Sequence, residues 1–167
     1  MDLSFDFIGP INDENILCLR NYIAGQTEPI EHLTINISSC GGAVPAGIAI
    51  YNYLKQQTFD ITTHNLGEVS SSAILLYLAG TTRTAETISK FMIHPLRMTG
   101  EPDMSCHRIE ELLKIINADI RNYAEIVNRE TNSLHGKFNI DICLRAICMT
   151  LNAADANDCG IVTQMNE

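Results

Sequence analysis

The chain has 167 residues, of which 46% are hydrophobic and 19% charged, a composition typical of folded globular proteins and not of disordered ones. No linker rich in proline, glycine or serine divides it, so we expect a single domain over residues 1–167 that folds without disulfides or a structural metal. The net charge of -9, without a cluster of Lys and Arg, argues against nucleic acid and anionic membranes as partners.

Short apolar runs alternate with helical patterns in the first third of the chain. A strand is predicted over residues 5–8, followed by a helix that Asn12 caps and Gly25 ends. A second strand, rich in β-branched residues, is predicted over residues 33–37. The next helical pattern runs over about 44–55.

The same alternation continues to the end of the chain. A strand over residues 61–64 precedes an apolar helix over about 71–79, and a short strand over residues 91–94 follows it. The longest helical pattern covers about 105–130, with apolar residues three and four positions apart. The last predicted elements are helical pieces over 142–149 and 153–158 and a strand over 161–162.

This order of elements predicts an α/β fold with a mainly parallel sheet, because consecutive strands joined by helices form right-handed crossovers. In such sheets, chemistry gathers at the carboxyl ends of the strands. The sequence therefore directs attention to the residues that follow Ile37, His64 and His94.

Three groups of residues with complementary chemistry follow these strands. The pair Gly41-Gly42 can turn backbone amides towards a ligand, the run of serines at 70–72 begins a helix, and His94 ends a strand before a proline. Taken separately, each has a structural interpretation: a tight turn, a helix cap and a hydrogen-bonded histidine. Together they supply the amide donors, hydroxyl and base of an acyl-transfer site.

Features outside this site indicate a cytoplasmic protein without cofactors. The acidic start MDLSFD lacks the pattern of a signal peptide, and the most apolar window is shorter than the about 20 residues that span a bilayer. The six cysteines form no CxxC pair and no set with metal-ligand spacing, so we expect no metal site.

Ordered segments of the chain resemble the proteolytic subunit of the Clp protease family. Residues 35–51, INISSCGGAVPAGIAIY, are similar to the family's I-N-S-P-G-G-S-V-x-A-G-x-A-I-Y, and residues 67–80 to its G-x-A-A-S-M-G-A-x-L-L-x-A-G. Residues 92–94 match its M-I-H, and residues 152–162 resemble S-A-x-E-A-x-x-Y-G-L-V. The similarity runs over about residues 5–162.

The resemblance implies a serine endopeptidase with the Clp/crotonase-like fold, built from repeated β-β-α and βα units. It puts the nucleophile on Ser71, the base on His94 and the oxyanion-hole amides on Gly42 and Ser72. The family forms rings of seven subunits, stacked in pairs, into which an ATPase feeds unfolded chains. The helix over about 105–130 would be the protruding handle that joins the rings.

Departures from the family pattern concern the third triad member and the start of the chain. Cys148 stands where the family has its aspartate, and Asp141 and Asp155 are the carboxylates nearest in sequence. Losing the orienting acid costs other serine proteases about 10⁴-fold in turnover. The segment that precedes the first core strand in the family, which helps to engage the ATPase, is expected to be absent.

Two alternatives of different classes therefore stand beside a serine endopeptidase. One is a weakly active or inactive Clp-like structural subunit, motivated by Cys148. The other is a crotonase-type acyl-CoA enzyme, which would share the fold and the oxyanion amides but would not need Ser71 and His94.

Overall fold

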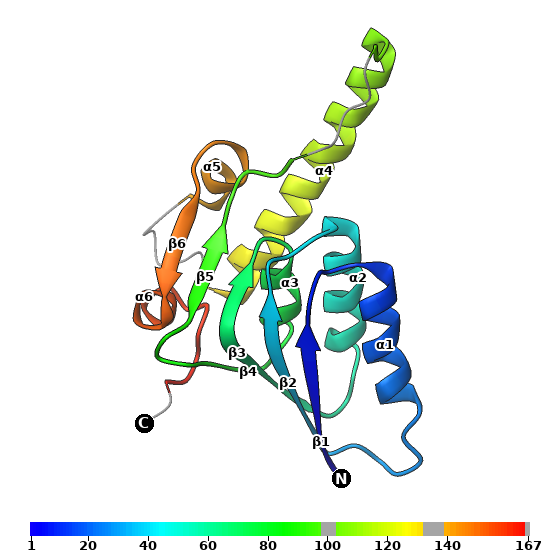
Figure 1. Cartoon of the computed structure of the whole chain (residues 1–167), viewed down its shortest axis with the longest axis vertical. Helices are drawn as coiled ribbons and strands as arrows, with labels where there is room; N and C mark the ends of the chain where they lie inside the picture. The colour runs from blue at the N-terminus through cyan, green and yellow to red at the C-terminus, as the bar shows by residue number, and fades with distance from the viewer. Residues whose placement is uncertain (98–102, 132–138, 166–167) are drawn as a thin grey trace.

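The computed structural model describes residues 1–97, 103–131 and 139–165, which form a sheet covered by helices (Figure 1). The strand order is β1-β2-β3-β5-β6, and β4 also pairs with β3. Every strand pair is parallel except β5 with β6. The strands are β1 (Asp2–Ile8), β2 (His32–Ser39), β3 (Asp60–Ser70), β4 (Thr82–Ala85), β5 (Lys90–Ile93) and β6 (Met149–Asn152).

The first helices form where the local signals in the sequence place them. Helix α1 (Asp13–Ala24) begins after Asn12, whose side chain accepts a hydrogen bond of 2.8 Å from the Asn15 amide, and it ends at Gly25. Helix α2 (Val44–Lys55) has the predicted bounds. Between them, β2 alternates buried and partly exposed residues, as expected for a strand with one face against the core.

Strand β3 is longer than predicted, and Ser71 follows its end directly. The sequence suggested an end at His64, but the strand continues to Ser70. Its first half pairs with β4 over Thr62–Asn65, and its second half pairs with β5 over Glu68–Ser70. Along one edge of β3, β4 is therefore the neighbouring strand first and β5 afterwards. The strand β4 was not predicted. The prediction of a strand end at His64 is wrong, because pairing with β5 carries the strand on through Gly67.

The region after α4 (Cys106–Glu130) differs from the prediction in two places. Residues 142–149 do not form one helix: α5 (Ile140–Arg145) is followed by strand β6, which pairs antiparallel with β5. The predicted strand at 161–162 is also wrong. Ile161 and Val162 are buried, but their amides donate to the Ala156 carbonyl at the end of α6 (Ala153–Asp158).

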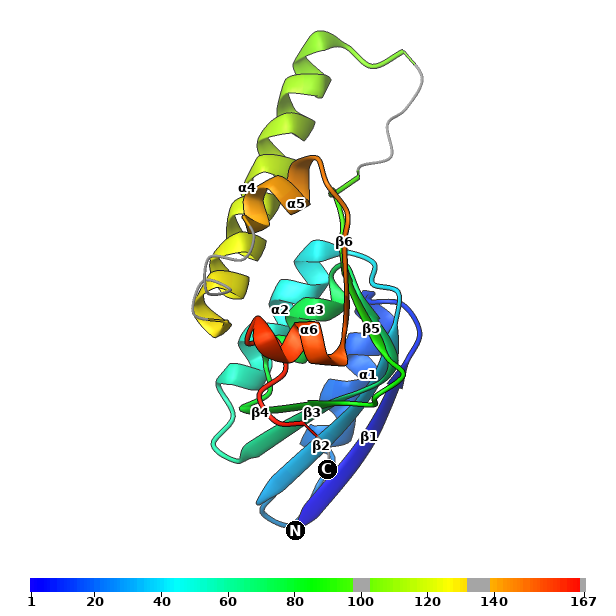
Figure 2. The same ribbon diagram turned by 90° about the vertical axis from the view of Figure 1, so that its left-hand side faces the viewer.

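The helices and the sheet form layers from which one long helix projects (Figure 2). Helices α2 and α3 (Ala73–Leu78) pack against each other and lie on the same side of the sheet. Only the C-terminal half of α4 contributes buried residues, such as Tyr123 and Val127, while its N-terminal half projects beyond the body. The predicted α/β fold with a mainly parallel sheet and a protruding helix is confirmed. In the described ranges, no helix combines the length and apolarity that crossing a membrane requires.

Candidate active site

Ser71 stands in a turn between β3 and α3. The helix was predicted to begin at this residue, but it begins at Ala73, and Ser71 has a left-handed backbone with a φ of 54°. Such a conformation is unusual for a residue with a side chain and is often found at functional sites. The Ser71 amide donates to the Met92 carbonyl at 2.7 Å, and its carbonyl accepts from the Tyr123 hydroxyl at 2.8 Å. Strand β5 and helix α4 therefore hold the turn from two sides.

The two neighbouring serines are engaged differently. The Ser70 hydroxyl donates to Glu68 at 2.7 Å, which lowers the pKa of that carboxyl. The Ser72 hydroxyl is fully buried and makes no cap hydrogen bond, nor any other within the described residues. Of the three serines, Ser71 is the one that lines a cavity.

The glycine turn after β2 lies directly against Ser71. A Cβ atom on Gly41 would come within 2.6 Å of the Ser71 Cβ, so only glycine permits this approach. The Gly41 φ of 93° also favours glycine. In the part of the chain that the structure describes, the amides of Gly42 and Ser72 donate to no protein acceptor. Gly42 lines the cavity beside Ser71, whereas Ser72 is buried next to it.

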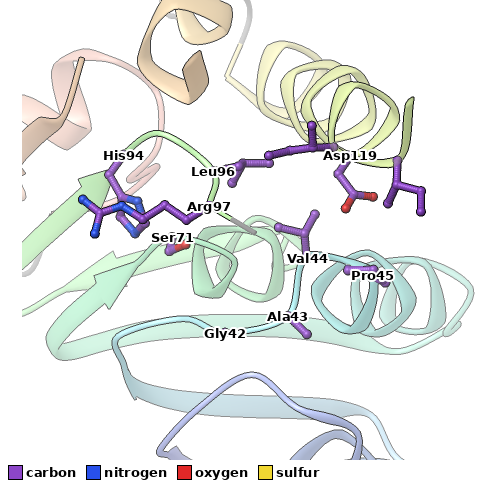
Figure 3. A pocket seen from close by; sticks show the side chains of 11 residues that line it. Gly42, Ala43, Val44, Pro45, Ser71, His94, Leu96, Arg97 and Asp119 are labelled. Atoms are coloured by element: carbon purple, nitrogen blue, oxygen red, sulfur yellow. The ribbon is translucent and has the colours of Figure 1, made fainter. Parts of the chain in front are cut away.

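His94 follows β5 immediately and lines the same cavity as Ser71 and Gly42 (Figure 3). Its Nδ1 lies 2.9 Å from the Pro95 carbonyl oxygen, and a proton on Nδ1 would be donated to that carbonyl. In that tautomer, Nε2 carries the free lone pair that a base requires. No hydrogen bond between the Ser71 hydroxyl and His94 occurs among these described residues.

The cavity has a volume of about 390 Å³ and lies between the glycine turn, the start of α2 and helix α4. Its apolar wall is formed by Ala43, Val44, Pro45, Leu96, Ile115 and Ile116. Its charged or titratable side chains are His94, Arg97 and Asp119. An apolar wall with a few polar groups is typical of a site that binds an organic ligand.

Cys148 and His94 lie just beyond the ends of two paired strands. The antiparallel ladder of β5 and β6 ends at the pair Ile93 and Met149, and His94 and Cys148 are the residues next to that pair. The Cys148 side chain is exposed and lines a second cavity together with Cys143. Burial, and then the nearby Cys148, raise the pKa of the Cys143 thiol. Position 148 therefore lies next to the end of the ladder that His94 follows, but it carries no carboxylate.

Neither of the two carboxylates considered as replacements lines the cavity of Ser71. Asp141 lies in the first turn of α5, where its Oδ2 accepts from the Arg145 Nε at 2.8 Å. Asp155 lies in the first turn of α6, beyond Asn152, which pairs with Lys90 at the start of β5. His94 follows the other end of that strand, so β5 separates it from Asp155.

Sequence reasoning missed two residues of α4 that belong to the site. Tyr123 binds the Ser71 carbonyl, and Asp119 lines the cavity. A signal existed: Asp119 stands three residues after Ile116 and four before Tyr123, so it lies on the apolar stripe of the helix. A carboxylate on such a stripe indicates a cavity or a buried partner. Within the described ranges, no group of His, Cys, Asp or Glu side chains is suited to hold a metal ion.

Comparisons with known proteins agree on one family. The family model described as Clp protease matches residues 11–167. The ATP-dependent Clp protease proteolytic subunit 2 of Prochlorococcus marinus (strain MIT 9313) is 33% identical over 144 residues, which are 83% of this chain and 67% of the relative. The ATP-dependent Clp protease proteolytic subunit 1 of Corynebacterium jeikeium (strain K411) is 34% identical over 93 residues, or 53% of this chain and 50% of the relative.

A solved structure resembles the whole described fold. A mutant of ClpP1 from Listeria monocytogenes aligns with a TM-score of 0.75, covering 98% of this chain and 91% of that chain, at 24% sequence identity. At this identity the likeness supports the fold alone. The sequence matches span about two thirds of the Prochlorococcus subunit and half of the corynebacterial one.

Proposed function

Because the chain belongs to the Clp protease family, we propose that it is a serine endopeptidase that hydrolyses peptide bonds through Ser71 and His94. One observation carries the proposal: Ser71, held in a strained turn, opens on the same cavity as His94 and the Gly42 backbone. A strained strand-to-helix turn that exposes a serine is the arrangement of a nucleophile in many hydrolases. In this proposal, residues 1–167 form a single Clp protease-like domain.

The proposed reaction proceeds through an acyl-enzyme. The Ser71 hydroxyl attacks the carbonyl carbon of the scissile bond while His94 Nε2 takes its proton. The amides of Gly42 and Ser72 donate to the oxyanion that forms, and collapse of this intermediate expels the amine, which His94 protonates. Water, activated by His94, then attacks the ester and releases the second peptide. The unengaged state of both amides supports their role as donors.

The Pro95 carbonyl is the proposed substitute for the missing triad acid. It lies 2.9 Å from Nδ1, where a triad aspartate would hold the imidazole in its reactive tautomer. A carbonyl dipole stabilises the imidazolium less than a carboxylate does, because it carries no net charge. The proposal therefore includes a turnover lower than that of an enzyme with a complete triad.

Assembly, partners and location extend the proposal. The relatives are ATP-dependent Clp protease subunits, and we extend to this chain a ring of identical subunits, heptameric or doubly heptameric, which degrades unfolded proteins with an ATPase partner. The exposed Ile109 and Leu113 on the projecting half of α4 suit a contact between such rings. A cytoplasmic location suits a chain in which Cys18, Cys40, Cys106, Cys143 and Cys148 are free thiols.

A fluorophosphonate probe tests the central claim. It should label the folded protein at Ser71, and Ser71→Ala should abolish labelling together with hydrolysis of casein and fluorogenic peptides. Ser70→Ala is the matched control, because the Ser70 hydroxyl is bound to Glu68 and should not react.

The alternative function is that of an inactive structural subunit. Cys148 and the missing hydrogen bond between the Ser71 hydroxyl and His94 in the described residues favour it. A folded protein that forms rings but shows no labelling that depends on Ser71 would support this alternative and contradict the peptidase.

A further inference from the structure

One carboxylate lines the largely apolar cavity beside Ser71. Asp119 is the acidic member of the lining, and apolar side chains from α2, α4 and the segment after β5 surround the same space. His94 and Arg97 are the basic members. A carboxylate in such a setting can recognise a cation and select among ligands.

The Asp119 carboxylate is partly withdrawn from water, and within residues 1–97, 103–131 and 139–165 it makes no hydrogen bond or ion pair. Burial raises the pKa of Asp119, because desolvation disfavours the charged carboxylate. A cation brought by a ligand would relieve this uncompensated desolvation.

The charged groups of the cavity lie at different ends. Figure 3 shows the Asp119 carboxylate below α4, facing Val44 and Pro45. The Arg97 side chain extends in the other direction, towards the side of the cavity where His94 and Ser71 lie. Arg97 therefore does not neutralise Asp119. The apolar wall of the cavity separates Asp119 from Ser71 and His94.

We propose that this cavity receives the substrate side chain next to the scissile bond and that Asp119 makes it prefer lysine or arginine. This inference rests on the proposed function, since it uses Ser71 to mark the scissile bond. The aliphatic stem of the basic side chain packs on Val44, Leu96 and Ile116, and its charged end reaches Asp119. Long basic side chains are suited to such a site because their stems are apolar and their charge is terminal.

Binding to the Ser71→Ala protein tests the inference without requiring catalysis. Fluorescent product peptides that end in lysine, norleucine or glutamate are titrated by fluorescence anisotropy. Norleucine has the stem of lysine without its charge, so the ratio of the two affinities isolates the ammonium group. We expect lysine to bind about tenfold more tightly, between the values for an exposed and a buried ion pair, and glutamate to bind most weakly.

Two variants in the Ser71→Ala background identify the source of this preference. Asp119→Asn keeps the shape of the side chain and should bring the ratio of lysine to norleucine affinity close to one. Glu125→Gln removes the same charge from an exposed position on α4 outside the cavity and should leave the ratio unchanged. A preference that is absent, or that survives Asp119→Asn, would overturn the inference, as would a failure of every peptide to bind.

Failure of this inference and failure of the proposed function give different results. A protein labelled at Ser71 that prefers norleucine is a peptidase with an ordinary apolar subsite. A protein without labelling whose Ser71→Ala form still selects lysine through Asp119 has the subsite without the chemistry.

Discussion

Ser71 is buried and has a left-handed backbone, and it forms hydrogen bonds with residues of β5 and α4. Strained non-glycine positions cost about 1–3 kcal/mol and persist where the surroundings determine them. Here the Met92 carbonyl and the Tyr123 hydroxyl engage the two peptide groups that flank the residue. These contacts hold the backbone of the turn, which sets the direction of the Cα–Cβ bond of Ser71 at the edge of the cavity.

Replacing Cys148 with aspartate should raise peptidase turnover. The last pair of the β5–β6 ladder is Ile93 with Met149, and continuing this register by one position would set residue 148 opposite His94, where an added carboxylate would stabilise the charged imidazole. We expect a gain of about tenfold or more in turnover, below the about 10⁴-fold value of a triad acid because Pro95 already engages Nδ1. Turnover is measured with fluorogenic peptides at saturating concentration.

Cys148→Ser is the control for this change, because it alters the side chain at the same position without adding charge. An equal gain in both variants would show that the thiol was inhibitory and that the carboxylate is not the cause. An unchanged rate in Cys148→Asp would contradict the register argument.

Gly41→Ala should destabilise the fold and disturb the nucleophile. Its Cβ would lie 2.6 Å from the Ser71 Cβ and 2.7 Å from the Ser70 carbonyl oxygen, and the φ of 93° is strained for alanine. We expect a loss of about 2–4 kcal/mol in the free energy of unfolding, measured in urea, together with loss of probe labelling. Gly67→Ala is the control, since its Cβ would meet nothing within 4 Å. Equal stability of the two variants would contradict the close approach.

At the scale of elements, β3 and a buried arginine organise the sheet around the site. Strand β3 exchanges β4 for β5 along one edge, and this places Ser71 beside the end of β5. Arg83 of β4 is 5% exposed and donates to the carbonyls of Gly80, Glu130, Gly160 and Ile161. One side chain thus joins the end of α4 and the segment after α6 to the sheet.

Arg83→Met should lower the free energy of unfolding by about 3 kcal/mol or more, because it leaves several buried carbonyls without a donor. The measurement is urea denaturation followed by circular dichroism. Arg108→Met is the control: Arg108 forms an exposed ion pair of 3.0 Å with Glu111, so its removal should change stability by less than about 1 kcal/mol. Similar losses in both variants would contradict the role of Arg83 as a buried connection.

At the scale of the whole molecule, the N-terminal end of α4 projects beyond the body (Figure 1). Its C-terminal half carries the buried residues of the helix, whereas Ile109 and Leu113 on the projecting half are exposed. A helix with unpaired apolar side chains on a projecting arm is suited to bind a second molecule. This agrees with the ring assembly proposed above.

Leu113→Asp should therefore weaken self-association. We expect the wild-type chain to sediment as a multiple of its 18.5 kDa subunit and the variant to sediment as smaller species, because a charge on an apolar contact must be desolvated. Leu17→Asp is the control, since Leu17 on α1 is equally exposed at 54% but lies on the body. A wild-type protein that sediments as a monomer would contradict the ring.

The sequence by itself determined the features that depend on neighbouring residues. Asn12 and Gly25 bound α1, and helix α2 and the start of α4 follow their local patterns. The order of strands and helices likewise predicted the parallel α/β fold, and ordered motifs pointed to Ser71, His94 and Gly42 as residues of one site. Caps, periodicity and motif order are local, so they can be read along the chain.

Tertiary structure decided what depends on partners distant in the sequence. The length of β3, the existence of β4 and β6 and the buried loop at Ile161 follow from pairing and packing across the sheet. Asp119 entered the site because α4 folds back over the glycine turn. Local patterns do not specify these partners, because the free energy of the contacts comes from residues that meet only when the whole chain is folded. The place of Asp119 on the apolar stripe indicates a cavity or a partner, but it does not identify the glycine turn.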